Sequence, residues 1–223
     1  MRTIAVIARK GGSGKTTVAV HLAIAAQLAD RRTVIADADP QKSASEALKP
    51  RDPDGPRVIE TTGRKLFALQ VEIQRSGADL MVIDTAAGLE ESLGHAIVLA
   101  DLSLLVVRPT FLDIAAAVQS LQVIRRLRRP AMVVLNQAPV ARDGTEPPSV
   151  KRALEALKIM RAPVVPAIIR ARSIYQSALE VGRSAQELTP GAPAAREIGD
   201  LWAFVDNMVF GKSAAWNAAP PDA

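Results

Sequence analysis

The sequence predicts an α/β fold in which a mostly parallel, twisted sheet carries helices on both faces. Three observations lead to this prediction. Short runs of valine, isoleucine and leucine alternate with longer segments whose apolar residues recur at helical spacing. The short runs are apolar throughout, which is typical of parallel strands buried on both faces. The chain also has 223 residues, 48% of them hydrophobic, which suffices for one sizeable core.

The expected strands are short and end in polar residues. They cover the segments 4–8, 32–37, 79–84, 102–108, 131–136 and 162–169. The expected helices lie between and after them, at 16–29, 63–77, 90–100, 112–127, 149–160, 172–181 and 195–212. Ligands of such sheets bind beyond the carboxyl ends of the strands. Three residues at strand ends are therefore candidates for a binding site: Asp37, Asp84 and Asn136.

Two segments, 49–58 and 138–150, are rich in proline and charge and are interpreted as surface loops. Because the alternation of strands and helices resumes after each of them, neither marks a domain boundary. We therefore expect a single domain over residues 1–212. The segment 213–223 is rich in alanine and proline and is expected to be disordered.

The composition excludes several classes of protein. The chain has no cysteine, which excludes disulfides, iron–sulfur clusters and cysteine-ligated zinc. The apolar run near its start, residues 3–8, is too short for a secretory leader. No segment approaches the roughly 20 apolar residues that a membrane-spanning helix needs. These features predict a cytoplasmic protein.

The stretch "KGGSGKTT", residues 10–17, lies between the first expected strand and the first expected helix. Its three glycines would let successive N–H groups turn inward, and the helix start adds its positive end, so that together they form a cradle for an anion. The pattern predicts a phosphate-binding loop in which Lys15 reaches the β- and γ-phosphates and Thr16 joins the coordination of Mg²⁺. The alternative is a glycine-rich turn with an exposed lysine. The residues of this loop predicted to bind nucleotide are Lys10, Gly11, Gly12, Ser13, Gly14, Lys15, Thr16 and Thr17.

The loop departs from the usual phosphate-loop pattern at its start. A glycine normally stands five positions before Gly14. Here that position is Arg9, and a second lysine, Lys10, follows it. A phosphate loop with an additional lysine needs an explanation for that lysine.

Two further motifs place carboxylates at strand ends. "DTAAG" begins with Asp84, where a phosphate-loop protein keeps the carboxylate that holds Mg²⁺ through water. "DADPQ" places Asp37 and Asp39 on the same side of an extended backbone, where they can divide metal positioning and water orientation between them. Each motif alone could be a turn or a helix cap. The phosphate loop favours the catalytic interpretation of both.

Together, "KGGSGKTT", "DADPQ" and "DTAAG" resemble the ParA/MinD group of deviant Walker-A ATPases, which have the phosphate-loop NTPase fold. The resemblance extends along nearly the whole chain and implies that ATP and Mg²⁺ are its ligands. It also explains the additional lysine, since the matching residue of the family reaches across a dimer interface to the phosphates held by the other subunit. A cation supplied in this way stabilises the transferring phosphoryl group only when two subunits meet. The resemblance thus implies a homodimer that forms when ATP is bound.

The resemblance assigns a role to each residue that matches a family motif. Asp39 would orient the attacking water. The catalytic residues would be Lys10, Lys15 and Asp39. The residues of the Mg²⁺ site would be Thr16, Asp37 and Asp84.

Two residues outside the three motifs are candidates for contacting the adenine base. Asn136 ends an expected strand at the position where relatives place an adenine-contacting side chain, and Pro166 would border the base. A single asparagine at a strand end can also be only a turn former.

Basic residues are concentrated in one part of the chain. Residues 108–183 contain thirteen Lys or Arg and five Asp or Glu, a net charge of +8, whereas the rest of the chain has 15 and 18, a net charge of −3. Such a region is typical of contacts with a phosphate backbone and predicts sequence-independent, salt-sensitive DNA binding. The alternative for its densest part, "RRLRR" at 125–129, is a solvated helix end. The candidate DNA-binding residues are Arg125, Arg126, Arg128, Arg129, Lys151, Arg152, Arg170 and Arg172.

Within the family the chain resembles the short ParA-like partition proteins, which lack an N-terminal DNA-binding domain. We therefore predict a nucleoid-associated ATPase with weak intrinsic activity that partitions a plasmid together with a centromere-binding or cargo-adaptor protein that stimulates hydrolysis. A carboxysome or a chemoreceptor cluster as cargo would use the same chemistry.

Two alternatives belong to other functional classes. The first is a MinD-like, membrane-associated ATPase, but the helical pattern at 195–212 carries acidic rather than basic residues opposite its apolar face, so stable membrane binding is not expected. The second is a dethiobiotin-synthetase-like metabolic enzyme, against which Lys10 argues.

Overall fold

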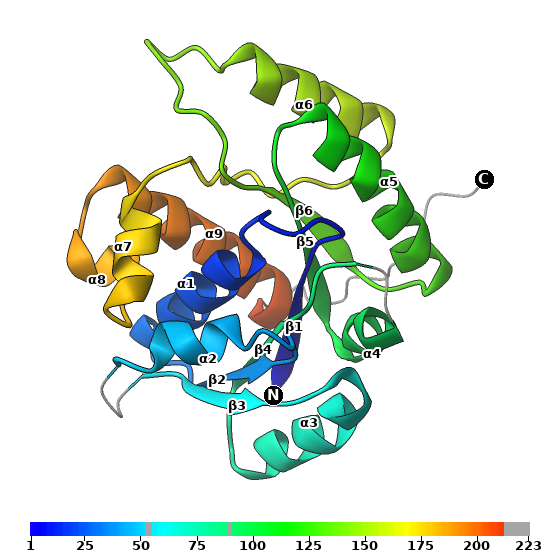
Figure 1. The fold of residues 1–223 in the computed structure, drawn as a ribbon, viewed down its shortest axis with the longest axis vertical. Helices are drawn as coiled ribbons and strands as arrows, with labels where there is room; N and C mark the ends of the chain where they lie inside the picture. The colour runs from blue at the N-terminus through cyan, green and yellow to red at the C-terminus, as the bar shows by residue number, and fades with distance from the viewer. Residues whose placement is uncertain (52–54, 89–90, 212–223) are drawn as a thin grey trace.

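The computed structural model describes residues 1–51, 55–88 and 91–211. Its centre is a six-stranded sheet in the order β3-β2-β4-β1-β5-β6 (Figure 1). Every pair of neighbouring strands in this sheet is parallel. The strands are β1 (Arg2–Ile7), β2 (Thr33–Asp37), β3 (Arg57–Glu60), β4 (Leu80–Asp84), β5 (Leu102–Val107) and β6 (Ala131–Leu135). The predicted α/β fold is confirmed.

Helices cover both faces of the sheet, which gives three layers (Figure 1). One layer consists of α1 (Lys15–Leu28), α2 (Ser43–Leu48), α7 (Ile174–Glu180), α8 (Ala185–Leu188) and α9 (Pro193–Phe210). The other consists of α3 (Leu66–Arg75) with the short 3-10 helix η1 (Gly63–Lys65) before it, α4 (Glu91–Leu99), α5 (Phe111–Arg126) and α6 (Pro148–Ile159).

The strands are apolar on both sides because both sides are covered. In β1, Ile4 and Val6 pack into the layer of α1 and α9, whereas Ala5 and Ile7 pack into the layer of α3 to α6. All four side chains are fully buried. Since successive side chains of a strand point to opposite faces, the unbroken apolar run is what a central strand of a covered parallel sheet requires.

The predicted strand at 162–169 is not a regular strand. This segment runs beside β6, and the backbone N–H groups of Val165 and Ile169 each donate to a β6 carbonyl at 2.9 Å. Pro163 and Pro166 have no N–H group to donate, which prevents a continuous ladder of hydrogen bonds. The prediction of a regular strand is therefore wrong, although the segment is extended along the edge of the sheet.

Three short elements were not expected from the sequence. The strand β3 begins at Arg57, within the segment 49–58 that was predicted to be a loop, and it is a partly exposed edge strand of four residues. Helices α2 and α8 have six and four residues. Elements this short contain too few residues for a recognisable hydrophobic period. The tail at 213–223 lies outside the described residues.

Helix α9 packs on the sheet, as predicted for the last helical pattern. Its apolar residues, Ile198, Leu201, Trp202 and Val205 among them, are buried in the core shared with α1. The side that an interfacial membrane helix would present to lipid is thus covered by protein. Among the residues that the structure describes, no helix has the length and hydrophobicity to cross a bilayer.

Candidate nucleotide-binding site

The glycine-rich loop lies at the carboxyl edge of the sheet, between β1 and α1 (Figure 1). Gly12 and Gly14 have φ values of 72° and 86°, which only glycine adopts readily. Among the residues that the structure describes, no side chain caps the start of α1, so the first N–H groups of this helix remain available for an anion. The backbone therefore has the form of the predicted anion cradle.

Lys15 is buried, with 7% of its surface exposed. Across the described parts of the chain, its ammonium group forms no ion pair. A buried ammonium group without a direct ion pair is costly, and a phosphate group in the cradle would supply one. This observation fits a nucleotide at the site.

Thr16 and Asp84 come together at the end of β4. The Thr16 hydroxyl donates to Asp84 Oδ2 at 2.7 Å, while the other oxygen, Oδ1, is buried and without a hydrogen-bond partner in the residues described. Burial and, to a smaller extent, the nearby charge of Asp37 raise the pKa of Asp84 to about 7, against the hydrogen bond from Thr16. A hydroxyl beside an unsatisfied carboxylate suits a hard, oxygen-binding cation such as Mg²⁺.

Asp37 lies opposite Asp84 in the pairing of β2 with β4. Its Oδ2 accepts hydrogen bonds at 2.9 Å from both the backbone N–H and the hydroxyl of Ser45. Asp37 therefore anchors the start of α2 at the edge of the site. Within the described residues, no three His, Cys, Asp or Glu side chains form a metal-binding group, so Mg²⁺ would need phosphate oxygens in addition to Thr16 and the aspartates.

Asp39 is half-buried and lines a cavity of about 550 Å³ beyond the ends of β2 and β3. Its Oδ1 accepts the backbone N–H of Gln41 at 2.9 Å, and its own N–H donates to Asp37 Oδ1 at 3.3 Å. The carboxylate is thus held in a tight turn beside open space. This placement fits a residue that orients a water molecule.

Lys10 is half-buried and lines a crevice with Asp113 of α5. Although burial opposes it, hydrogen bonds from Arg108 and Thr110 and the charges of Arg108 and Lys10 lower the pKa of Asp113. Arg108 donates to both carboxylate oxygens of Asp113, at 2.9 and 3.2 Å. Lys10 itself forms no ion pair with any described residue, so its ammonium group is available for a ligand outside its own subunit.

Asn136 follows the end of β6 and is 3% exposed. Its amide Nδ2 donates to the carbonyl of Ser13, inside the loop, at 2.7 Å. The next residue, Gln137, was not among the predicted site residues, yet its Nε2 donates to the carbonyl of Gly12 at 3.0 Å. Pro166 is exposed on the segment beside β6. The adenine contacts of Asn136 and Pro166 stay predictions.

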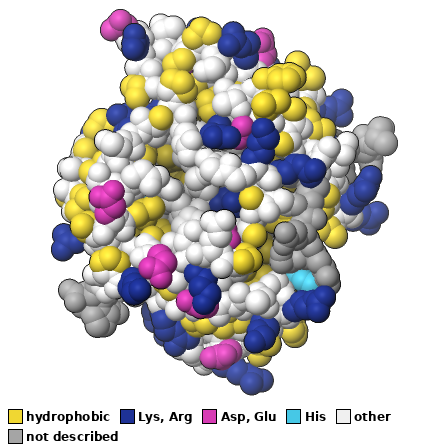
Figure 2. Space-filling view, viewed as in Figure 1, with side chains coloured by type: hydrophobic (Ala, Val, Ile, Leu, Met, Phe, Trp, Pro, Cys, Tyr) yellow, Lys and Arg dark blue, Asp and Glu magenta, His cyan; other side chains and the backbone are white. Residues whose placement is uncertain are grey.

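The eight candidate DNA-binding residues divide into two groups. Four bond to other parts of the chain: Arg125 and Arg129 donate to backbone carbonyls, and Arg170 and Arg172 pair with Glu146 and Glu197. The other four are exposed and form no ion pair with a described residue: Arg126, Arg128, Lys151 and Arg152. In Figure 2, Lys and Arg side chains gather across the centre and right-hand side, where the loop after β1 and helix α5 lie in Figure 1.

Comparison with known proteins identifies the family. Residues 4–184 match the model of the CobQ/CobB/MinD/ParA nucleotide-binding domain. The chain belongs to this family. The predicted resemblance is confirmed, and the chain is an ATPase of this nucleotide-binding family.

Two relatives carry the same name, "Maintenance of carboxysome distribution protein A". The protein of Gloeobacter kilaueensis is 33% identical over 188 residues, which cover 82% of this chain and 83% of the relative. The protein of Halothiobacillus neapolitanus is 28% identical over 211 residues, which cover 89% of this chain and 94% of the relative.

Solved structures share the fold. The cell division ATPase MinD of Pyrococcus furiosus superimposes with a TM-score of 0.75 at 21% identity, covering 93% of this chain and 99% of MinD. The apo McdA of Cyanothece gives a TM-score of 0.76 at 18% identity, covering 92% of this chain and 99% of McdA. Further structures with this fold include a MinD complex with Mg-ADP and an McdA complex with ATP.

Proposed function

We propose that this chain is a ParA-like positioning ATPase. ATP closes two copies into a sandwich dimer, the dimer holds DNA without regard to sequence, and a cargo-bound partner protein stimulates hydrolysis and release. The observation that carries the proposal is Lys10, an unpaired cation beside a phosphate loop in a chain of this family. The ammonium group of Lys10 gains a binding partner only when a second copy brings its bound nucleotide to it.

The residues of the site divide the work of hydrolysis. The loop and Lys15 hold the phosphates, Thr16 and Asp84 hold Mg²⁺, and Asp39 orients the attacking water. A Mg²⁺ ion held by these residues would neutralise charge on the phosphate oxygens. Because Lys10 completes the site only across the dimer, hydrolysis is coupled to assembly, and the isolated subunit is a slow enzyme.

The proposed DNA-binding surface consists of four exposed basic residues, two at the end of α5 and two near the start of α6. Arg126 and Arg128 lie at the end of α5, and Lys151 and Arg152 near the start of α6. None of the four forms an ion pair with a residue that the structure describes. Unpaired surface cations can neutralise phosphates and release counter-ions, which gives affinity that depends on salt rather than on sequence.

The cargo is a large cellular assembly. The names of two relatives support a protein compartment of the carboxysome type, ahead of the plasmid that the sequence pattern alone favours. Tracking compartments and plasmids in cells that lack this chain separates the two: uneven compartments with normal plasmid retention support the first, and plasmid loss with normally spaced compartments overturns it.

A co-sedimentation experiment tests DNA binding directly. The variant Arg126→Glu/Arg128→Glu should lose DNA binding in the presence of ATP, and the slope of log affinity against log salt should become shallower by about two, since two phosphate contacts are lost. ATP-dependent dimerisation should be unchanged, because neither side chain lies at the loop.

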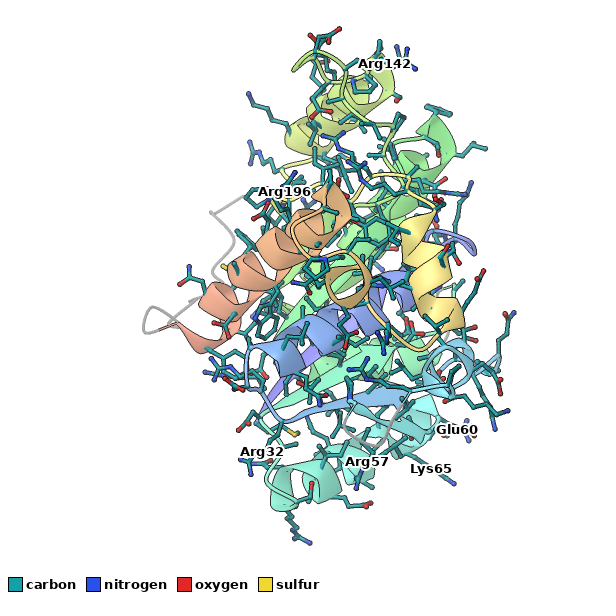
Figure 3. All side chains as sticks on the ribbon, turned by 90° about the vertical axis from the view of Figure 1, so that its left-hand side faces the viewer. Arg32, Arg57, Glu60, Lys65, Arg142 and Arg196 are labelled. Atoms are coloured by element: carbon teal, nitrogen blue, oxygen red, sulfur yellow. The ribbon has the colours of Figure 1, made fainter. Side chains whose placement is uncertain are left out.

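The matched control is Arg57→Glu/Lys65→Glu, which changes the charge equally. Both residues are exposed and lie toward the end of the molecule opposite Arg142 (Figure 3). Equal DNA affinity in the two double variants would contradict the assigned surface. Capture by anionic liposomes without capture by DNA would overturn the proposal in favour of a membrane-associated ATPase.

A further inference from the structure

Two consecutive side-chain amides hold two consecutive carbonyls of the phosphate loop. Asn136 Nδ2 donates to the carbonyl of Ser13 at 2.7 Å, and Gln137 Nε2 donates to the carbonyl of Gly12 at 3.0 Å. The partners are 123 and 125 residues apart in the chain. The contact thus joins the end of β6, on one side of the sheet, to the loop after β1.

The backbone of Gln137 makes this double contact possible. In a regular strand, successive side chains point to opposite faces, and only one of the two amides could reach the loop. Gln137 instead has φ 52°, in the left-handed region that a non-glycine residue adopts at a cost. Neighbouring backbone bonds hold it there, since Asn136 N–H donates to Val107 and Ala138 N–H donates to Ile169.

The two hydrogen bonds determine which way the loop N–H groups face. In a planar trans peptide the C=O and the N–H point in opposite directions. Fixing the carbonyls of Gly12 and Ser13 toward β6 therefore fixes the N–H groups of Ser13 and Gly14 away from it. In the described structure these two N–H groups donate to no protein acceptor, so they remain for an anion.

Gly14 is fitted to the same contact. A Cβ atom at this position would lie 2.2 Å from Asn136 Nδ2, well inside contact distance. Glycine at this position thus permits both the positive φ and the close approach of the asparagine. The glycines of the loop leave its backbone little restraint of its own, which is why an external one matters.

We propose that Asn136 and Gln137 are positioning residues that hold the peptide groups of the loop in the phosphate-binding orientation before nucleotide arrives. A loop already in its bound conformation loses less entropy on binding, and the affinity for phosphate rises accordingly. The inference rests on the proposed binding of phosphate at this loop and is independent of the DNA and cargo parts of the proposed function.

The test uses substitutions that keep the shape and remove the donor, Asn136→Leu and Gln137→Met, with Gln119→Met on the exposed side of α5 as the control. The affinities for ATP, GTP and inorganic tripolyphosphate are measured by calorimetry with Mg²⁺. Asn136→Leu should weaken the binding of ATP and of tripolyphosphate by the same factor, roughly tenfold. Gln137→Met should weaken the binding of both by severalfold. The ratio of ATP to GTP affinity should stay unchanged in both.

A second readout does not depend on nucleotide. Backbone order parameters of residues 12–14, measured by nitrogen relaxation in the free protein, should fall in both variants and stay unchanged in Gln119→Met. Because Gln137 is exposed, its variant remains informative even where Asn136→Leu folds poorly.

Two results would overturn the inference. If Asn136→Leu lowers ATP affinity but not tripolyphosphate affinity, and alters the ratio of ATP to GTP, Asn136 acts on the base instead. If phosphate affinity and the backbone order parameters of the loop are both unchanged in Gln137→Met, the second hydrogen bond does not orient the loop. Neither result bears on DNA binding or dimerisation, which are measured separately.

Discussion

Asp39 uses one carboxylate oxygen for its own turn and leaves the other for solvent. Oδ1 accepts the N–H of Gln41 at 2.9 Å, while in the described structure Oδ2 accepts no hydrogen bond. The residue lines a cavity rather than the core. A fixed carboxylate with one free oxygen can orient a water molecule without rearranging.

The substitution Asp39→Asn should separate catalysis from assembly. The amide oxygen of asparagine can still accept the bond from Gln41, so the turn survives, but the negative charge that polarises water is lost. We expect hydrolysis to fall by roughly 100-fold or more, with the ATP-bound dimer accumulating. Phosphate release and sedimentation measure the two effects.

The control for this variant is Asp30→Asn, at an exposed aspartate just after α1. Hydrolysis at the unaltered rate in Asp39→Asn would remove Asp39 from the catalytic role. A monomer in the presence of ATP would show that its charge serves assembly as well.

Residue by residue, the site was predictable where the chemistry depends on strand ends. Thr16 and Asp84 are 68 residues apart and hydrogen-bonded, as a phosphate loop and a neighbouring strand end require. The role of Gln137 was not predictable, because its left-handed backbone cannot be read from an ordinary polar residue after a strand. The ion pairs of Arg170 and Arg172 were not predictable either, because their partners, Glu146 and Glu197, are distant in the sequence.

At the scale of elements, α1 runs through the core and carries a buried histidine. His21 Nδ1 lies 2.8 Å from the Thr17 carbonyl, and its ring meets that of Tyr175 edge to face with centroids 5.2 Å apart. Burial lowers the pKa of His21 to about 4, although the bond to Thr17 opposes this. The folded protein therefore keeps this histidine neutral where the unfolded chain would protonate it.

Acid should consequently destabilise the fold through His21. Between its ordinary pKa of 6.5 and about 4, the unfolded chain binds a proton that the folded protein does not, so the free energy of unfolding falls as the pH falls through this range. The loss from this one group approaches about 3 kcal/mol below the lower value. Urea unfolding at several pH values between 7 and 4 measures it.

The variant His21→Leu should flatten this pH dependence, because the titrating group is gone, even if the variant is less stable at pH 7. The matched control is His95→Gln, at the other histidine of the chain. An identical slope of stability against pH in His21→Leu and in the unaltered protein would contradict the assignment.

The boundaries of long helices and strands could be predicted from the sequence more closely than those of short ones. Helices α1, α5 and α6 and the central strands have enough residues to show their period, and the structure places them within a few residues of the expected segments. The short α2, α8 and β3 depend on tertiary context. In α2, for example, the start of the helix is held by Asp37, a residue of the neighbouring strand.

At the scale of the whole molecule, the loop edge of the sheet has the character of an interface. Phe111 and Leu112, at the start of α5, are 83% and 61% exposed, close in sequence to Asp113, which shares a crevice with Lys10. Exposed large apolar side chains are unfavourable in water and favourable against a second protein surface. ATP-dependent pairing of two copies through this edge would cover both.

Sedimentation with a non-hydrolysable ATP analogue and Mg²⁺ tests this pairing most directly. We predict that the chain sediments as a dimer, at twice its 23.7 kDa, and as a monomer without nucleotide. The variant Lys10→Ala should stay monomeric while still binding the analogue, and Lys158→Ala, an exposed lysine on α6, should behave as the unaltered chain. A chain that stays monomeric with the analogue bound, or a Lys10→Ala variant that dimerises normally, would contradict the proposal that a cation donated between subunits joins nucleotide binding to assembly.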